Sequence, residues 1–220
     1  MSSINWRSQL RRYQLEGAQW LCETAPNRRG RILADPRGFG KTVQAIAAAR
    51  MRQEAGYDGH CIPVLTSAVA RGDWRRELKR WWPEAHVHIV SMDDVVSRKK
   101  KTKKGVTVWQ ESLEDLQVRR QAEWVPALRG ERGITFLIAA YQSARTVLDQ
   151  ALKHEVLFDS IICDEAHALS HYHTETSKAV RPLVSKSRTA FLLTGTPIYN
   201  RPYDLYNLLE TCVAGYGSSM

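Results

Sequence analysis

The chain has 220 residues, 43% of them hydrophobic, and a formal net charge of +9 at pH 7. It is long enough for one α/β domain with a full core and too short for two such domains. Its four scattered cysteines, and the lack of a leader or of an apolar run near about 18 residues, argue against a secreted disulfide scaffold and a membrane protein, so we expect an intracellular location.

Residues 6–23 predict the first helix, because Leu10, Tyr13 and Trp20 recur near one face. A Pro-Asn-Arg-Arg-Gly segment then ends this helix and leads into a short buried strand at residues 32–34. The next segment, residues 43–50, is rich in alanine and strongly favours a helix.

The turn between this strand and this helix predicts a phosphate-binding loop. Gly38 and Gly40 let the backbone approach an anion, and the new helix offers unpaired N–H groups. Lys41 would reach the β- and γ-phosphates, and the Thr42 hydroxyl would ligate the accompanying Mg²⁺. Asp35 occupies the first glycine position of the G-x-x-x-x-G-K-[ST] pattern, so the match is incomplete. The alternative is an ordinary glycine-containing turn.

The rest of the chain alternates predicted strands with predicted helices. Strands are expected at residues 60–66, 86–90, 134–141, 158–163 and 188–193, and helices at 74–82, 108–128, 143–154, 174–185 and 202–212. This alternation predicts an α/β fold with a mostly parallel sheet flanked by helices. Trp74 lies at apolar spacing with Leu78 and Trp81, which favours core packing over base stacking.

A basic run at residues 98–104 holds six positive charges, which leaves +9 − 6 = +3 for the rest of the chain. We expect an exposed loop there, because like charges repel one another and cannot be buried. The run either contacts a nucleic-acid backbone or is a solvated loop without a specific role. A nuclear import signal is a third interpretation.

Two adjacent carboxylates, Asp164 and Glu165, follow the fifth predicted strand. We expect them at the carboxyl edge of the sheet, where open α/β sheets bind ligands. Asp164 can hold Mg²⁺, and Glu165 can orient and deprotonate the water that attacks a γ-phosphate. An acidic helix cap explains only one of the two. His167, His171 and His173 could form a zinc site, but the carboxylates have the stronger competing role.

Four segments occur in the order of one family's motifs: residues 10–21, 35–42, 164–167 and 193–200. They resemble the first RecA-like lobe of the Swi/Snf-type ATPases, within helicase superfamily two, in which Asp at the position of Asp35 is usual. The third segment reads Asp-Glu-Ala-His, a DEAH box. The resemblance implies a three-layer RecA-like P-loop NTPase domain over residues 1–213, with a basic insertion near 97–130. It also implies that residues 214–220 are a tail and that the second lobe is absent.

The resemblance also implies the roles of individual residues. The motif with Tyr13 and Gln14 would contact the adenine, with the amide pairing to the base edge, although Tyr13 could also be a core residue. His167 would connect the nucleotide site to the next motif. Thr194 and Thr196 would relay the state of the γ-phosphate to the other lobe. The complete nucleotide-binding set is Tyr13, Gln14, Asp35, Gly38, Phe39, Gly40, Lys41, Thr42, His167, Thr194 and Thr196.

Two strand ends correspond to places where the family touches nucleic acid. Thr66 and Ser67 stand where Ala-Pro is expected, and their hydroxyls are candidates for binding a nucleic-acid phosphate. Alanines replace hydroxyl residues at the end of the strand predicted at 134–141, which leaves Tyr141 and Gln142 as candidates there.

These observations predict the ATP-binding lobe of a DNA-dependent ATPase that couples hydrolysis to translocation on double-stranded DNA. Its catalytic residues would be Lys41, Asp164 and Glu165, its metal ligands Thr42 and Asp164, and its cofactors ATP and Mg²⁺. The expected partners are double-stranded DNA and a second RecA-like lobe, which would carry an arginine finger. The alternatives are a free-standing nucleic-acid-binding or regulatory lobe and the motor of another superfamily-two helicase or restriction system.

Overall fold

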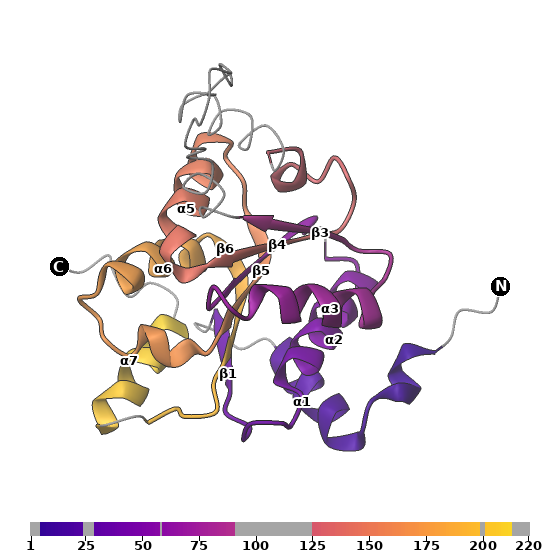
Figure 1. Cartoon of the computed structure of the whole chain (residues 1–220), viewed down its shortest axis with the longest axis horizontal. Helices are drawn as coiled ribbons and strands as arrows, with labels where there is room; N and C mark the ends of the chain where they lie inside the picture. Colours follow the sequence, from indigo (N-terminus) through magenta and orange to yellow (C-terminus); the bar gives the residue numbers. More distant parts are fainter. Residues whose placement is uncertain (1–4, 24–28, 58, 91–124, 199–200, 213–220) are drawn as a thin grey trace, which may run out of the picture.

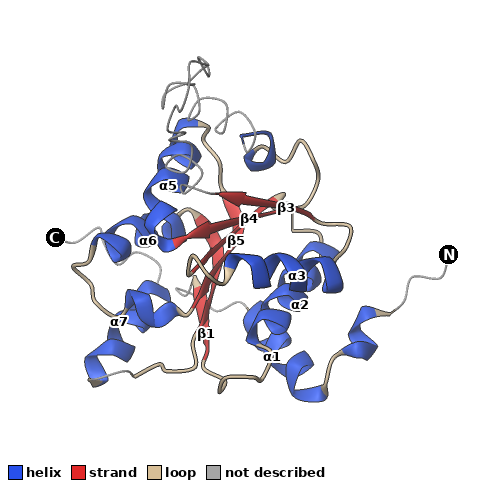
Figure 2. Cartoon of the chain, viewed as in Figure 1, coloured by secondary structure: helices blue, strands red, loops and turns tan. Residues whose placement is uncertain are grey.

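The computed structural model describes residues 5–23, 29–57, 59–90, 125–198 and 201–212. One six-stranded sheet runs through the centre of the domain in the order β1-β6-β5-β2-β4-β3 (Figures 1 and 2). The strands are β1 (Gly30–Leu33), β2 (Cys61–Thr66), β3 (His86–Val90), β4 (Thr135–Ala140), β5 (Phe158–Asp164) and β6 (Ser187–Leu193). Every pairing in this sheet is parallel, which confirms the predicted fold class.

Helices cover both faces of the sheet, which makes three layers (Figure 1). On one face lie α1 (Arg12–Cys22), α2 (Lys41–Glu54) and α3 (Arg71–Trp81). On the other face lie α5 (Ala144–Lys153), α6 (Glu175–Ser185) and α7 (Pro202–Cys212). The described part of the chain also has three short 3-10 helices, η1 (Trp6–Gln9), η3 (Tyr141–Ser143) and η4 (Ala166–Leu169).

Each layer of helices has its own apolar core, and alternate residues of the strands contribute to the two cores. In β5, Ile162 packs with the helices α1, α2 and α3, whereas Ile161 and Cys163 pack with α5, α6 and α7. Burial on both faces explains why the central strands are almost continuously apolar.

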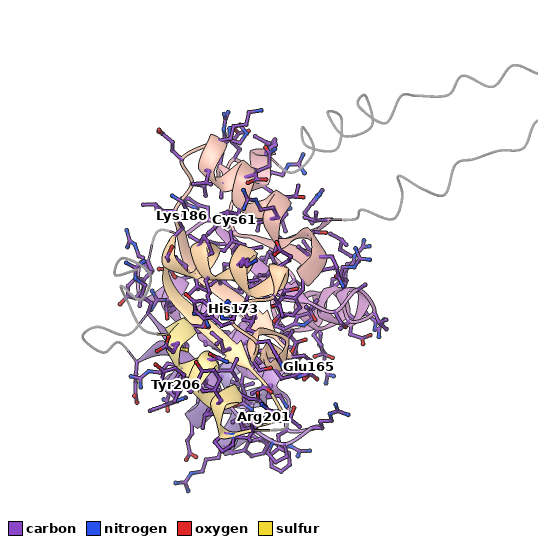
Figure 3. The ribbon with its side chains drawn as sticks, turned by 90° about the vertical axis from the view of Figure 1, so that its left-hand side faces the viewer. Cys61, Glu165, His173, Lys186, Arg201 and Tyr206 are labelled. Carbon is purple, nitrogen blue, oxygen red and sulfur yellow. The ribbon has the colours of Figure 1, made fainter. Side chains whose placement is uncertain are left out.

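The strands run from one end of the domain to the other. In Figure 3, Cys61 at the start of β2 and Lys186 just before β6 lie near one end, and Glu165, which follows β5, lies toward the other. Because all six strands are parallel, their carboxyl ends meet at the end of the domain that contains Glu165.

The prediction of one continuous helix over residues 6–23 is wrong. The structure has η1 and then α1, with extended backbone at Leu10 and Arg11 between them. The Gln14 side chain accepts a hydrogen bond from the Arg11 backbone N–H at 3.0 Å, and this local cap starts a new helix.

Two other predicted features lie largely outside the described residues. These are the basic insertion near 97–130, of which only residues 125–130 are described, and the tail at 214–220. Among the helices in the described part of the chain, none combines the length and the apolar character needed to cross a membrane.

Candidate functional site

The predicted phosphate-binding loop lies between β1 and α2. Gly38 and Gly40 both have positive φ angles, +84° and +73°, and Gly40 is the residue that caps α2. A β-carbon on Gly40 would lie 2.5 Å from the Gln14 side-chain nitrogen. Glycine suits this position for its left-handed backbone conformation, and a β-carbon there would also displace the end of the Gln14 side chain.

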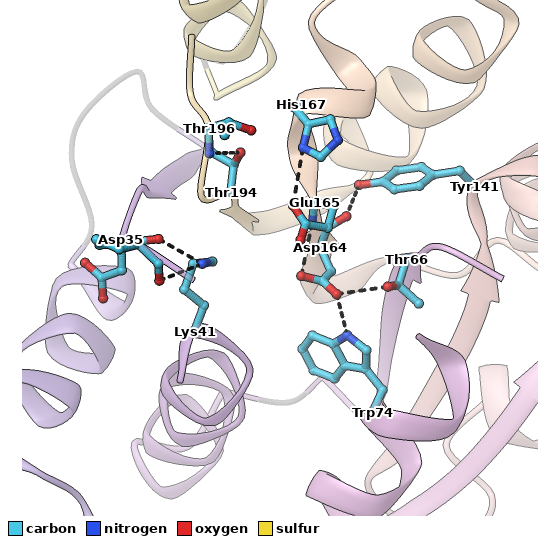
Figure 4. Close-up of polar contacts among 11 residues, drawn as sticks. Asp35, Lys41, Thr66, Trp74, Tyr141, Asp164, Glu165, His167, Thr194 and Thr196 are labelled. Atoms are coloured by element: carbon cyan, nitrogen blue, oxygen red, sulfur yellow. Dashed lines mark hydrogen bonds and ion pairs between the residues drawn. The ribbon is translucent and has the colours of Figure 1, made fainter. Parts of the chain in front are cut away.

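Lys41, the first residue of α2, points back across its own loop (Figure 4). Its Nζ donates to the carbonyl oxygens of Asp35 at 2.8 Å and Pro36 at 3.2 Å. The ammonium group is therefore held beside the unpaired N–H groups of the α2 N-terminus, where two sources of positive potential combine.

Gln44 holds the shape of this loop from inside the protein. It is fully buried, and its Nε2 donates to the Asp35 carboxylate at 2.8 Å and to the Phe39 carbonyl at 3.1 Å. Asp35 is therefore turned toward Gln44, and the Phe39 ring lies against Tyr13 with their centroids 5.5 Å apart. Gln44 is not among the site residues predicted from the sequence, although its place one turn into α2 could have indicated it.

The Asp164 carboxylate is fixed by three donors at the end of β5 (Figure 4). Oδ2 accepts from the Thr66 hydroxyl at 2.9 Å and from the Trp74 indole N–H at 2.8 Å. Oδ1 accepts from the backbone N–H of Glu165 at 3.0 Å. Asp164 is partly buried, and Figure 4 shows it across the site from Lys41.

Glu165 has a left-handed backbone conformation, with φ +49° and ψ +50°. A residue with a side chain rarely adopts this conformation, which stores strain and is typical of functional sites. Its Oε2 lies 3.3 Å from Nδ1 of His167, the second residue of η4. The expected link from His167 to the next motif stays a prediction.

Two residues expected to touch nucleic acid instead support Asp164. Thr66 is fully buried, and its hydroxyl is used by the Asp164 carboxylate. Tyr141 is 7% exposed and donates to the Asp164 carbonyl at 2.8 Å. Burial raises the pKa of Tyr141 well above its ordinary value, so this hydroxyl keeps its proton. The expectation of nucleic-acid contact was wrong for both; Ser67 and Gln142 are exposed.

The turn after β6 comes close to the loop after β1. The Thr194 hydroxyl accepts the backbone N–H of Thr196 at 3.1 Å, and Thr194 is fully buried. A β-carbon built on Gly195 would lie 3.6 Å from the Lys41 ammonium. The turn that contains Thr194 and Thr196 therefore lies next to the lysine.

The loop after β1 and the end of β5 border an open cleft of about 700 Å³. Most of the predicted site residues line it: Tyr13, Gln14, Gly38, Gly40, Lys41, Thr42, Asp164 and Glu165. Asp35, Phe39, His167, Thr194 and Thr196 lie outside its wall. Helix α3 forms another side of the cleft through residues that include Trp74, Glu77 and Trp81. The predicted phosphate-binding groups and the paired carboxylates therefore share one concave surface.

The residues that line this cleft fit a Mg²⁺ ion that takes only some of its ligands from the protein. Mg²⁺ is usually bound by one or two carboxylates, with waters and substrate phosphates as its other ligands. Thr42 and Asp164, which both line the cleft, supply such a partial set. Within the described ranges of the chain, no three His, Cys, Asp or Glu side chains come together as a metal site, and the three histidines considered for zinc form no such group.

Comparison with known families decides the relationship of this chain. The model of the SNF2-related domain matches residues 13–218. The chain belongs to the SNF2-related domain family.

This SNF2-related domain is similar to parts of much longer proteins. It is 28% identical over 203 residues to the ISWI chromatin-remodeling complex ATPase ISW1 of Saccharomyces cerevisiae, covering 92% of this chain and 15% of that protein. It is 31% identical over 205 residues to Helicase swr1 of Emericella nidulans, a match that covers 92% of this chain and 10% of that protein. The chain thus spans a small part of the curated relatives that it matches.

A solved structure confirms the fold of the SNF2-related domain. The SWI2/SNF2 ATPase core of Sulfolobus solfataricus, determined in complex with double-stranded DNA, matches with a TM-score of 0.64 at 24% identity. The match covers 94% of this chain and 36% of that one. The RecA-like architecture expected from the motifs is therefore present.

Proposed function

We infer that this SNF2-related domain binds Mg·ATP in the cleft and is the first lobe of an ATPase that acts on double-stranded DNA. The observation that carries the proposal is the meeting of Lys41, from the loop after β1, with Asp164 and Glu165, from the end of β5, in one cleft. An ATPase needs these groups together, and an ordinary turn or helix cap does not.

The loop after β1 would hold the phosphates. Its left-handed glycines and the N-terminus of α2 present backbone N–H groups to an anion. The Lys41 ammonium, now bonded to two loop carbonyls, would exchange these partners for phosphate oxygens. Tyr13 and Gln14 line the same cleft and would bind the adenine, with the Gln14 amide offering a donor and an acceptor.

The carboxylates have separate tasks. Thr42 and Asp164 would hold Mg²⁺, which neutralises charge on the phosphates. Glu165 would orient the attacking water and accept its proton, because its side chain is only partly buried and lines the cleft. His167, at 3.3 Å, would keep the Glu165 carboxylate in place.

Coupling to DNA requires more than this lobe. The turn with Thr194 and Thr196 lies beside Lys41 and would report the state of the γ-phosphate to a second lobe. That lobe would supply the arginine whose contribution to the rate is about 10³–10⁵. Double-stranded DNA as partner is supported by the DNA complex of the Sulfolobus structure and by the basic charge of this chain.

The test is ATP binding and hydrolysis by the purified chain, with and without double-stranded DNA. Lys41→Ala and Glu165→Gln are the site variants, and Lys178→Ala is the control, because Lys178 forms an exposed pair with Glu175 on α6. We expect Mg·ATP binding that Lys41→Ala abolishes and slow turnover that Glu165→Gln abolishes, with Lys178→Ala unchanged. Failure of the unmodified chain to bind Mg·ATP would overturn the proposal.

A further inference from the structure

We propose that Trp74, together with Thr66, positions the Asp164 carboxylate so that one oxygen, Oδ1, would be left available to a Mg²⁺ ion. Trp74 lies on α3, the helix that follows β2. The inference rests on the proposed function, because it assigns a task to residues that surround the metal-binding carboxylate.

The sheet brings the three side chains together. β2 and β5 are neighbours in parallel register, with Val64 opposite Ile162. Two residues further along each strand come Thr66 and Asp164, which therefore share the face that α3 covers. Trp74 is buried under the first turns of α3 on that same face. Figure 4 shows the indole and the hydroxyl approaching one carboxylate oxygen of Asp164.

The hydrogen bonds determine which oxygen stays available. An ionised carboxylate has about four acceptor positions, two on each oxygen. Thr66 and Trp74 use both positions of Oδ2, at 2.9 and 2.8 Å. The Glu165 N–H uses one position of Oδ1, at 3.0 Å. The position that remains is on Oδ1, so Oδ1 is the oxygen that would meet the metal or one of its waters.

The indole of Trp74 does more than fill the core. It is 1% exposed and belongs to the apolar cluster of α1, α2 and α3, so a phenylalanine there would also be buried. The indole N–H, which phenylalanine lacks, donates to the Asp164 carboxylate. Trp74 and Asp164 both line the cleft. A buried indole donor must find a partner, and here that partner is the proposed metal ligand.

A matched tryptophan separates positioning from packing. Trp82 follows α3, is 5% exposed in the same cluster, and packs edge-on against Phe136 with centroids 5.6 Å apart. Trp74→Phe and Trp82→Phe each remove one buried indole from this cluster. Only Trp74→Phe removes a donor from Asp164. Thr66→Val and Thr66→Ser form a second matched pair, since valine lacks the hydroxyl and serine keeps it.

The experiment compares the affinity for a fluorescent, non-hydrolysable ATP analogue in Mg²⁺ with the affinity in EDTA. The dissociation constant in EDTA divided by the dissociation constant in Mg²⁺ measures how much the metal strengthens binding. This ratio is measured without turnover. Trp74→Phe and Thr66→Val should reduce this ratio about tenfold, the lower range for loss of an outer-shell partner, while binding in EDTA stays unchanged. Trp82→Phe and Thr66→Ser should keep the ratio of the unmodified chain.

The possible failures are distinguishable. Equal ratios for Trp74→Phe and Trp82→Phe, with normal metal-dependent binding by the unmodified chain, would overturn the positioning role and leave the proposed function intact. If the unmodified chain binds no nucleotide in Mg²⁺, the proposed function fails and the positioning role fails with it. Circular dichroism melting checks that each variant is folded, and Thr66→Val gives an independent result if Trp74→Phe does not fold.

Discussion

The guanidinium of Arg52 and the carboxylate of Asp159 form a two-point ion pair inside the domain, with N–O distances of 2.9 and 2.8 Å. Their side chains are 3% and 7% exposed. The pair joins the last turns of α2 to the second residue of β5. It therefore connects the helix that begins at Lys41 with the strand that ends at Asp164.

Breaking this pair should destabilise the domain strongly. Arg52→Met leaves the Asp159 carboxylate buried without its partner, and we expect a loss of about 3–5 kcal/mol in the free energy of unfolding, measured in urea. Arg76→Ala removes an exposed pair with Asp73 and should change it by less than about 1 kcal/mol. Arg52→Met with Asp159→Leu should recover much of the loss. Similar losses for Arg52→Met and Arg76→Ala would contradict the prediction.

The two glycines of the predicted phosphate-binding loop, Gly38 and Gly40, should respond differently to alanine. Both have positive φ, so Gly38→Ala and Gly40→Ala should each lose about 1–2 kcal/mol from backbone strain. A β-carbon on Gly38 meets nothing within 4 Å, whereas one on Gly40 collides with Gln14. We therefore expect Gly40→Ala to weaken ATP binding more than Gly38→Ala in a titration. Adding Gln14→Ala should reduce the difference; if it does not, the collision is not the cause.

Replacing Gly17 of α1 by alanine should destabilise the domain, although this change usually stabilises a helix. Glycine-to-alanine changes in helices normally stabilise by about 0.5–1 kcal/mol. At Gly17 a β-carbon would lie 1.8 Å from Oε1 of the buried Gln44, so the Gln44 amide must shift, and its Nε2 bonds to Asp35 and Phe39 are disturbed. We expect Gly17→Ala to lower the unfolding free energy by about 1–3 kcal/mol and to weaken ATP binding.

Gly72 of α3 is the matched control for Gly17. A β-carbon there meets only the Arg76 side chain, at an ordinary 3.8 Å. Gly72→Ala should therefore stabilise the domain and leave nucleotide affinity unchanged. If Gly17→Ala instead stabilises the domain in the same urea experiment, the Gln44 side chain can move aside without lowering the free energy of unfolding, which would contradict the prediction.

The cysteines of β2 and α1 should be unreactive in the folded protein. Burial raises the pKa of Cys61 to about 12 and that of Cys22 to about 11, so both remain protonated near pH 8. The thiolate is the reacting form, and we expect iodoacetamide to label both only after unfolding. Mass spectrometry after labelling with and without urea measures this. Rapid labelling of Cys61 without urea would contradict the burial.

The sequence predicted the parallel sheet, the strand order along the chain and the two motif loops, because apolar strands and glycine turns are local signals. It did not predict the break at Leu10 and Arg11, which depends on the Gln14 side chain bonding back to the backbone. The predicted core position of Trp74 is confirmed.

The surroundings of Asp164 could not be predicted from local patterns. The resemblance made the Thr66 hydroxyl a candidate for a nucleic-acid phosphate, because Thr66 and Ser67 stand where the family has Ala-Pro. Its actual role depends on β2 lying beside β5, although 98 positions separate Thr66 from Asp164 in the sequence. The same long-range pairing determines the partner of the Trp74 indole. The assignment of individual residues to ATP and Mg²⁺ remains a prediction.

Strand β1 lies at the edge of the sheet and pairs through only four residues, Gly30 to Leu33, with β6. An edge strand can detach locally while the central strands remain paired, and amides there exchange with solvent sooner than those of the core. The loop that precedes Lys41 would lose its anchor in such an opening. Occupation of the loop by an anion should therefore slow hydrogen exchange across β1 more than across β2 or β5.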